Sequence, residues 1–255
     1  MSLIDLHCHI LPGIDDGAGD RAEALAMARL AVADGIATIV ATPHQLGPFA
    51  HNRGDSIRAA AAAFQLLLEE EQVTLRILPG AELRIEPGMV EAELAARLAS
   101  GELLTLANQG RHVLLDLPER VYVPLDRLLV ELAAAAFVPI LAHPERNREI
   151  LARPEILPPL VQAGCLLQVT AGSLLGEFGD EVRHVADRLV QQGVVQFVAS
   201  DAHHIHFRKP LLAEAFAHLA QLAGVDAAER LCHENPAAVA AGQPISALNP
   251  TIGME

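Results

Sequence analysis

The feature that most constrains the fold is a regular alternation of short apolar runs with longer amphipathic segments along the chain. Short continuous apolar runs are typical of buried strands. Strand and helix alternating this often predict an α/β protein with a parallel sheet covered by helices, and seven such units favour closure of the sheet into a barrel. The predicted strands are Leu3–Cys8, Thr38–Ala41, Thr74–Leu78, His112–Asp116, Pro139–Ala142, Cys165–Val169 and Val194–Ala199.

The segments between these runs are rich in Ala and Leu and carry apolar residues at helical spacing, with charges on the other face. They predict helices at Arg21–Ala33, Ser56–Glu71, Pro87–Ala99, Leu125–Ala136, Pro154–Ala163 and Asp180–Gln192. The sequence shows no linker and no change of composition, so we predict a single domain over residues 1–255. Its tail, Asn249 to Glu255, has no pattern of a helix or strand.

Charge and composition limit the partners. The chain has 18 Lys and Arg against 32 Asp and Glu, a net charge of −14, which disfavours nucleic acid and anionic membranes. Its three cysteines are too few for a disulfide framework. The sequence has no signal-peptide pattern and no apolar run of membrane-spanning length, so we expect a cytoplasmic protein without stable membrane insertion.

Metal-ligating side chains gather at the ends of the predicted strands. His7 and His9 are two apart on the first strand, so they point the same way and Cys8 points the opposite way. Six of the seven predicted strands end in His, Asp or Glu, which is unlike chance placement. Side chains from many strands converge at the C-terminal face of a barrel, so these residues are expected to meet there. These side chains are His7, His9, His44, Glu82, Asp116, His143, Asp201 and His203. Asp16 lies in an acidic turn shortly after the first strand.

Imidazole nitrogens and carboxylate oxygens suit Mn²⁺, Fe²⁺ or Zn²⁺, and no cysteine cluster suggests a structural thiolate site. Nine candidate ligands exceed the needs of one ion, so we expect two or three divalent ions that share a bridging carboxylate. Neighbouring divalent ions can bind a hydroxide and clamp a phosphoryl group. The pattern therefore predicts metal-dependent chemistry on a phosphate ester.

The motifs IDLHCHILPGIDDGA, ATPH, GAEL, AHPERN and SDAH, with a late Glu234-Asn235-Pro236, resemble the polymerase and histidinol phosphatase (PHP) family of metal-dependent phosphoesterases. Within it, the chain is most similar to the bacterial manganese-dependent protein-tyrosine phosphatases of capsular and exopolysaccharide synthesis. The resemblance runs from residue 3 to about residue 240. It implies a distorted seven-stranded (β/α)7, TIM-like barrel, the PHP fold, with a trinuclear metal centre. It also implies hydrolysis of phosphotyrosine on the tail of a cognate tyrosine kinase.

The resemblance assigns the metal ligands by position. His7, His9, Glu82 and Asp201 would hold the first ion, Glu82 would bridge to a second held by Asp116 and His143, and Asp16, His44 and His203 would hold a third. Asp16 matches the ligand position, whereas Asp15 does not. Asp116 departs from the family, which more often has the longer Glu there, so the second site is expected to be wider or to bind its ion through water.

Arg146 and Arg208 match the phosphate-holding positions of the family. A forked guanidinium suits bidentate contact with phosphate, and each arginine lies a few residues past a predicted ligand. The alternative is that Arg146 pairs with an acid such as Glu145 and that Arg208 is a surface residue. Both interpretations remain open on the sequence.

A thiolate nucleophile is not expected, because no C-x5-R loop follows Cys8 and both Cys8 and Cys165 are placed in the core. The predicted nucleophile is instead a metal-bound hydroxide. Other functions remain open: a small-molecule phosphatase acting on a histidinol-phosphate-like ester, a nuclease, which the acidic charge disfavours, and a non-catalytic regulatory partner of the kinase. The sequence does not give the oligomeric state or the identity of the metal.

Overall fold

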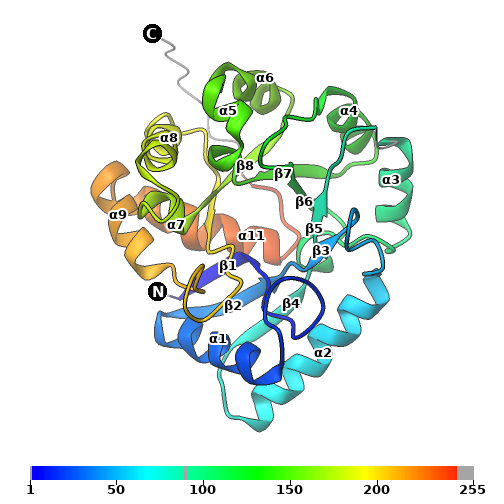
Figure 1. The fold of residues 1–255 in the computed structure, drawn as a ribbon, viewed down its shortest axis with the longest axis vertical. Coiled ribbons are helices and arrows are strands. Elements are labelled where there is room, and N and C mark those ends of the chain that lie inside the picture. The colour runs from blue at the N-terminus through cyan, green and yellow to red at the C-terminus, as the bar shows by residue number, and fades with distance from the viewer. Residues whose placement is uncertain (1, 89–90, 246–255) are drawn as a thin grey trace.

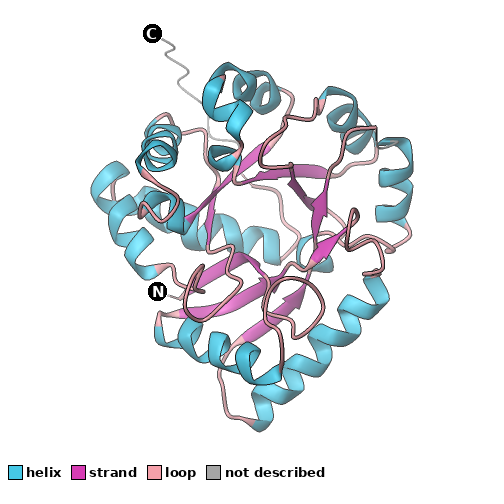
Figure 2. Ribbon diagram, in the orientation of Figure 1, coloured by secondary structure: helices cyan, strands magenta, loops and turns pink. Residues whose placement is uncertain are grey.

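A computed structural model describes residues 2–88 and 91–245, and its strands form a ring of parallel strands surrounded by helices (Figures 1 and 2). The predicted irregular tail, Asn249 to Glu255, lies outside the described residues. The strands are β1 (Leu3–Cys8), β2 (Ile36–Ala41), β3 (His44–Gln45), β4 (Arg76–Pro79), β5 (Glu82–Arg84), β6 (His112–Asp116), β7 (Val138–Ala142), β8 (Leu166–Thr170) and β9 (Phe197–Ala199).

These nine segments correspond to the seven predicted strands, because two of the seven are interrupted. One sheet has the order β1-β2-β4 and the other β3-β5-β6-β7-β8-β9. Only Thr42 and Pro43 separate β2 from β3, and Gly80 and Ala81 separate β4 from β5. Hydrogen bonds from Gly80 N to Ala41 O (2.9 Å) and from Glu82 N to Pro43 O (3.2 Å) continue the pairing across both breaks.

The ring closes between β1 and β9. Asp201 N donates to His7 O and His9 N donates to Ala202 O, each at 2.8 Å. Every strand pair in the two sheets is parallel, so all strands end at the same face of the ring. The predicted α/β barrel is confirmed, and its C-terminal face is where loops from many strands meet.

Helices cover the outside of the ring (Figure 2). Five of the predicted helices are present within a few residues of their predicted ends. The helical segments are α1 (Arg21–Ala33), α2 (Gly54–Glu70), α3 (Glu91–Ala99), η1 (Leu106–Asn108), α4 (Asp126–Ala134), η2 (Pro144–Arg146), α5 (Arg148–Ala152), η3 (Pro154–Ile156), α6 (Leu157–Gln162), α7 (Ala171–Leu174), α8 (Asp180–Gln191), α9 (Ala213–Ala223), α10 (Val225–Glu229), η4 (Arg230–Glu234) and α11 (Asn235–Ala240).

The prediction of one continuous helix over Pro154–Ala163 is wrong. The segment divides into the 3₁₀ turn η3 and the α-helix α6. Pro158 and Pro159 lack the N–H groups that would donate to the carbonyls four residues earlier, so the first turn cannot form the α-helical pattern. None of the helices in the described ranges has the length and apolarity that a membrane span requires.

Two apolar clusters lie on the two sides of the strands. The smaller cluster fills the ring with side chains such as Leu6, Leu114, Ile140 and Phe197, and Val239 of α11 packs against it. The larger cluster packs the strands against the outer helices and includes Cys8. The pairing of β1 with β2 shifts register between Asp5 and Cys8, which is typical of a bulge that redirects side chains near a site.

Candidate metal centre

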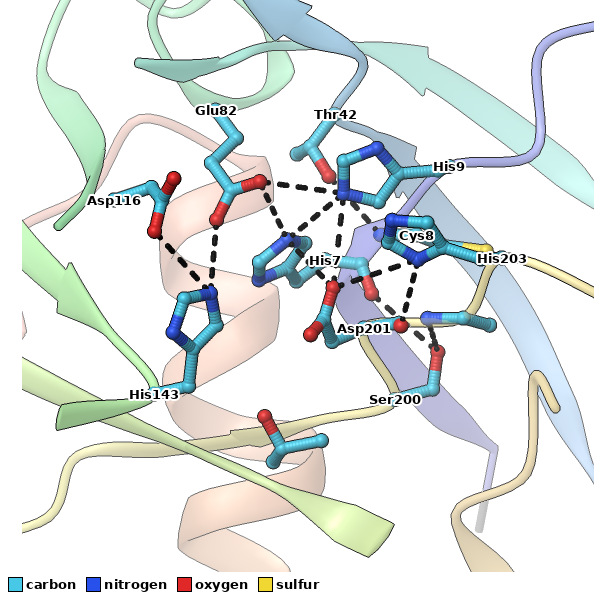
Figure 3. Close-up of polar contacts among 12 residues, drawn as sticks. His7, Cys8, His9, Thr42, Glu82, Asp116, His143, Ser200, Asp201 and His203 are labelled. Atoms are coloured by element: carbon cyan, nitrogen blue, oxygen red, sulfur yellow. Dashed lines mark hydrogen bonds and ion pairs between the residues drawn. The ribbon is translucent and has the colours of Figure 1, made fainter. Parts of the chain in front are cut away.

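The nine predicted ligands meet at the C-terminal face of the ring. Figure 3 shows seven of them pointing toward one another from different strands and loops. Strands β1, β3, β5 and β6 carry His7, His44, Glu82 and Asp116, and the others lie in loops that follow β1, β7 and β9. Three groups of donor atoms each lie within 4.8 Å of one another: His7, His9 and Asp201; His7, Glu82 and His143; and His9, Asp16, His44 and His203.

The first group has the spacing expected around a single ion. His7 Nε2 lies 3.2 Å from His9 Nε2 and 3.2 Å from Asp201 Oδ1. Both imidazole Nε2 atoms lie 3.3 Å from Glu82 Oε2. Ligands at 2.0–2.2 Å from a tetrahedral ion lie about 3.3–3.6 Å apart, so the donors of His7, His9 and Asp201 fit one divalent ion, and Glu82 Oε2 lies at the same spacing from both imidazoles.

Glu82 faces two of the groups at once. Its Oε2 is directed toward His7 and His9, while its Oε1 lies 3.1 Å from His143 Nε2. The carboxylate is 1% exposed, so it is held between protein side chains. This position is the one that a bridging ligand between two ions requires.

The third group combines Asp16, from the acidic turn after β1, with three histidines, His9, His44 and His203. Asp16 Oδ1 lies 3.5 Å from His44 Nε2 and 3.6 Å from His203 Nε2. The preceding Asp15 turns the other way, with its Oδ2 lying 2.7 Å from His9 Nδ1. The structure therefore brings Asp16, and not Asp15, to the donor atoms.

Asp116 is less closely placed than the other predicted ligands. Of the nine, all of which lie in the described ranges, it alone belongs to none of the three donor groups. Its Oδ1 is 3.8 Å from His143 Nε2, which is wider than the other donor spacings but still within the roughly 4.2 Å that two ligands of one ion can span. Its Oδ2 accepts a hydrogen bond from Arg84 Nη1 at 2.6 Å.

The electrostatic field of the site favours positive charge. Burial opposes protonation of His7 and His9, but the carboxylates around them outweigh it and raise both pKa values, that of His9 strongly. Burial likewise opposes ionisation of Glu82 and Asp201, yet the neighbouring cationic groups hold both pKa values well below the usual range. A field that stabilises imidazolium ions also stabilises divalent cations, so the donor set fits metal ions.

Two acceptors outside the donor groups fix the histidine rings, and the sequence did not identify either. Gln168 Oε1 lies 2.8 Å from His7 Nδ1, and Asp15 Oδ2 holds His9 Nδ1. Since both partners are acceptors, each ring carries a proton on Nδ1 and turns Nε2 toward the centre. Gln168 lies on β8, the one predicted strand without a ligand at its end. A buried glutamine in an otherwise apolar run is the signal that could have found it.

The loop that carries Asp201 is tied to β1. Asp5 is fully buried, and it accepts hydrogen bonds from Ser200 N at 3.0 Å and from Ser200 Oγ at 2.5 Å. Three site residues also have a positive φ: His143 (35°), Asp201 (51°) and Arg208 (47°). Such angles are costly for residues other than glycine, and they persist where surrounding contacts dictate the position of a functional side chain.

Both predicted arginines line the same pocket as the ligands, a cavity of about 400 Å³. Arg146 Nη1 and Arg208 Nη2 each donate to Asp201 Oδ2, and the Arg146 guanidinium stacks 4.4 Å from the centre of the Phe178 ring. The alternative in which Arg146 pairs with an acid holds for Asp201 and for Glu119, whose Oε1 lies 3.5 Å from Nη2, but not for Glu145. Glu145 is buried, and its Oε1 accepts from Thr170 N and Ser173 Oγ.

The cysteines lie away from the donor atoms. All three have free thiols and are buried. Burial, reinforced by Asp5 and Asp201, raises the pKa of Cys8 well above its ordinary value. A buried thiol with a raised pKa is a poor nucleophile, because the thiolate is the reactive form.

The comparisons with known proteins agree with this geometry. A family model described as capsular polysaccharide synthesis, CpsB/CapC, matches residues 3–241. The chain is 44% identical over 207 residues to the tyrosine-protein phosphatase YwqE of Bacillus subtilis, covering 81% of this chain and 79% of that protein. It is 31% identical to the putative tyrosine-protein phosphatase CapC of Staphylococcus aureus, over 84% of this chain and 82% of that one.

A solved structure has the same architecture. It comes from crystal structures of YwqE of Bacillus subtilis and CpsB of Streptococcus pneumoniae, described as unique metal-dependent tyrosine phosphatases. The similarity has a TM-score of 0.90 at 38% sequence identity and covers 97% of this chain and 98% of that chain.

Proposed function

This chain belongs to the CpsB/CapC family of capsular polysaccharide synthesis, and from that membership we propose that it hydrolyses phosphotyrosine on the tail of a cognate bacterial tyrosine kinase. It is a tyrosine-protein phosphatase of the metal-dependent kind. The kinase that it serves would control capsular or exopolysaccharide synthesis, in keeping with the description of the family.

One observation carries this proposal. Three groups of imidazole and carboxylate donors open into the same pocket as two arginines. The donors fit two or three divalent ions, and we assign Mn²⁺ to them because the sequence resembles the manganese-dependent phosphatases and carboxylate oxygens suit Mn²⁺. Fe²⁺ and Zn²⁺ are the alternatives that the same ligands accept.

The ligands are assigned as the donor spacings suggest. His7, His9, Glu82 and Asp201 would hold the first ion. Glu82 would also contribute to the second, together with His143 and Asp116, and Asp16, His44 and His203 would hold the third. Divalent ions held by these residues would supply an activated water and neutralise negative charge on the phosphoryl group, so that no cysteine nucleophile is required.

The side chains around the ions bind and orient the substrate. Arg146 and Arg208 donate from one side of the pocket and would hold the phosphoryl oxygens as negative charge shifts between them. Arg146 is kept in place by Phe178 beneath it and by Glu119, whose Oε1 lies 3.5 Å from Nη2. Asp15 and Gln168 keep the Nδ1 protons of the two β1-end histidines and so preserve their orientation.

The experiment compares substrates and metals in one assay. Purified protein is treated with a chelator, supplied with Mn²⁺, and assayed on a phosphotyrosine peptide from a kinase tail and on histidinol phosphate. We expect hydrolysis of the phosphotyrosine peptide to dominate and to disappear in His7→Ala. His184→Ala, which removes an exposed histidine on α8, is the matched control and should retain activity.

Two results would contradict the proposal. Faster turnover of histidinol phosphate than of the peptide would indicate a small-molecule phosphatase. Metal-loaded protein that turns over neither substrate nor p-nitrophenyl phosphate would indicate a regulatory partner instead of an enzyme.

A further inference from the structure

We infer that Arg84 is a positioning residue of the metal centre: it holds Asp116 so that Oδ1 of this short carboxylate faces the second ion. The inference rests on the proposed function, since it concerns a ligand of the proposed centre. Arg84 follows the GAEL motif and lines the same pocket as the ligands.

The two side chains are direct neighbours across the sheet. Arg84 on β5 is paired in register with Asp116 on β6. Glu82 lies two residues before Arg84 on β5, so both side chains point to the same face of the strand, toward the centre. Arg84 therefore supplies a positive charge beside two buried carboxylates that would otherwise repel each other, Glu82 (1% exposed) and Asp116 (3% exposed).

The two oxygens of Asp116 have different neighbours: Oδ2 contacts Arg84, and Oδ1 faces His143. Oδ2 accepts from Arg84 Nη1 at 2.6 Å, a charge-assisted hydrogen bond of short length. Oδ1 is left on the side of His143, 3.8 Å from Nε2. Tilting the carboxylate plane out of this orientation would break the Arg84 contact, so Arg84 selects the orientation in which one oxygen faces Arg84 and the other can reach an ion.

The arginine is itself confined. Gly47 has a φ of 51°, and a Cβ atom there would lie 3.3 Å from Arg84 Cγ and 3.0 Å from Glu86 Oε1. The backbone of the loop after β3 thus packs closely over the aliphatic stem of Arg84. This restraint matters because Asp116 is one methylene shorter than Glu and has less reach of its own. A fixed partner keeps that reach directed at the second ion.

The test measures metal binding, with no substrate present. Mn²⁺ is titrated into chelator-treated protein by calorimetry, and the ions retained after dialysis are counted by elemental analysis. Removing an outer partner of a metal ligand costs about 10- to 100-fold in metal affinity. We expect Arg84→Met to weaken one Mn²⁺ by that factor and to leave the other ions unchanged. Arg84→Lys should recover part of the affinity, because it keeps the charge and loses the fork.

Arg97→Met is the matched control. Arg97 is 33% exposed and its Nη2 pairs with Glu102 at 2.9 Å, whereas Arg84 is 32% exposed and pairs with Asp116 at 2.6 Å. Arg97 lies on α3 and does not line the pocket. Its replacement should leave every Mn²⁺ affinity at the wild-type value.

A double variant tests whether Arg84 acts through Asp116. In an Asp116→Ala background, Arg84→Met should cause no further loss of Mn²⁺ affinity. Additive losses, or wild-type Mn²⁺ binding in Arg84→Met, would overturn the inference. So would an unchanged metal content combined with a raised KM for phosphotyrosine peptide, which would make Arg84 a substrate contact. A wild-type protein that binds Mn²⁺ but hydrolyses no phosphotyrosine would refute the proposed function and not this inference.

Discussion

Replacing either pocket arginine should greatly reduce catalysis while leaving metal content intact. The perturbations are Arg146→Ala and Arg208→Ala. Both guanidinium groups donate to the same oxygen, Asp201 Oδ2, and neither is placed as a metal ligand. In each single variant, Asp201 keeps the other arginine as a partner. The first ion should therefore stay bound, and the loss should fall on the reaction.

The magnitude follows from what each guanidinium does in the pocket. Losing one positioned donor to developing charge costs about 2–4 kcal/mol of transition-state stabilisation, or about 30- to 1,000-fold in kcat/KM. Arg146 is 11% exposed and stacked on Phe178, while Arg208 is 27% exposed, so we expect Arg146→Ala to be the more costly change. Because the two groups share one carboxylate oxygen, the double variant should lose less than the sum of the single losses.

The assay is kcat/KM on a phosphotyrosine peptide, with metal quantified in the same samples. Arg146→Lys and Arg208→Lys should recover part of the loss, because a point charge cannot provide a forked contact. Arg29→Ala, which removes an exposed arginine paired with Glu71, serves as the control. If both pocket variants keep full metal and wild-type kcat/KM, the phosphate-holding assignment is wrong.

Three further predictions concern metal, the nucleophile and acid stability. Protein purified without chelator should contain two or three transition-metal ions per chain, and His7→Ala or Asp201→Ala should lose metal and activity together; less than one ion per wild-type chain by elemental analysis would refute this. Cys8→Ser should keep most activity, and a phosphoenzyme detected by mass spectrometry after rapid quench would show that the expected direct attack of water is wrong. Burial, with a smaller effect of the Arg111 charge, lowers the pKa of His112 to about 4, whereas in the unfolded chain it is about 6.5. The unfolded state therefore binds the proton first as pH falls through this window, which removes about 2 kcal/mol of stability at pH 5 relative to pH 8. His112→Gln should lose less stability between the two pH values in urea titrations, and an unchanged loss would contradict the assignment.

The sequence predicted the candidate metal ligands at the strand ends because their placement follows a simple rule of topology. Parallel strands in a ring end at one face, so polar residues after apolar runs must converge there whatever the exact register. His44, Glu82 and Asp116 could thus be placed at one site without knowing any distance between them. The interruptions of two strands, at Thr42–Pro43 and Gly80–Ala81, did not disturb this reasoning, because the segments on either side continue in the same direction.

The residues that hold the predicted ligands in place, Gln168 and Arg84, follow no such rule. Gln168 and His7 are 161 positions apart in the chain. They meet because only β9 lies between β8 and β1 around the ring. Arg84 reaches Asp116 because β5 and β6 pair in a particular register. Register and side-chain rotamers depend on packing of the whole barrel, and a single sequence does not reveal them.

The charges of the proposed metal ligands and of the nearby arginines would let an acidic protein bind phosphate, as the proposed function requires. The four proposed carboxylate ligands carry four negative charges, and three divalent ions would leave the ligand set with two positive charges inside a chain of net charge −14. Arg146 and Arg208 add positive charge at the same pocket. The attraction is therefore confined to the pocket, and it suits a single phosphate dianion. Long polyanions such as nucleic acids would have to approach the acidic surface around it.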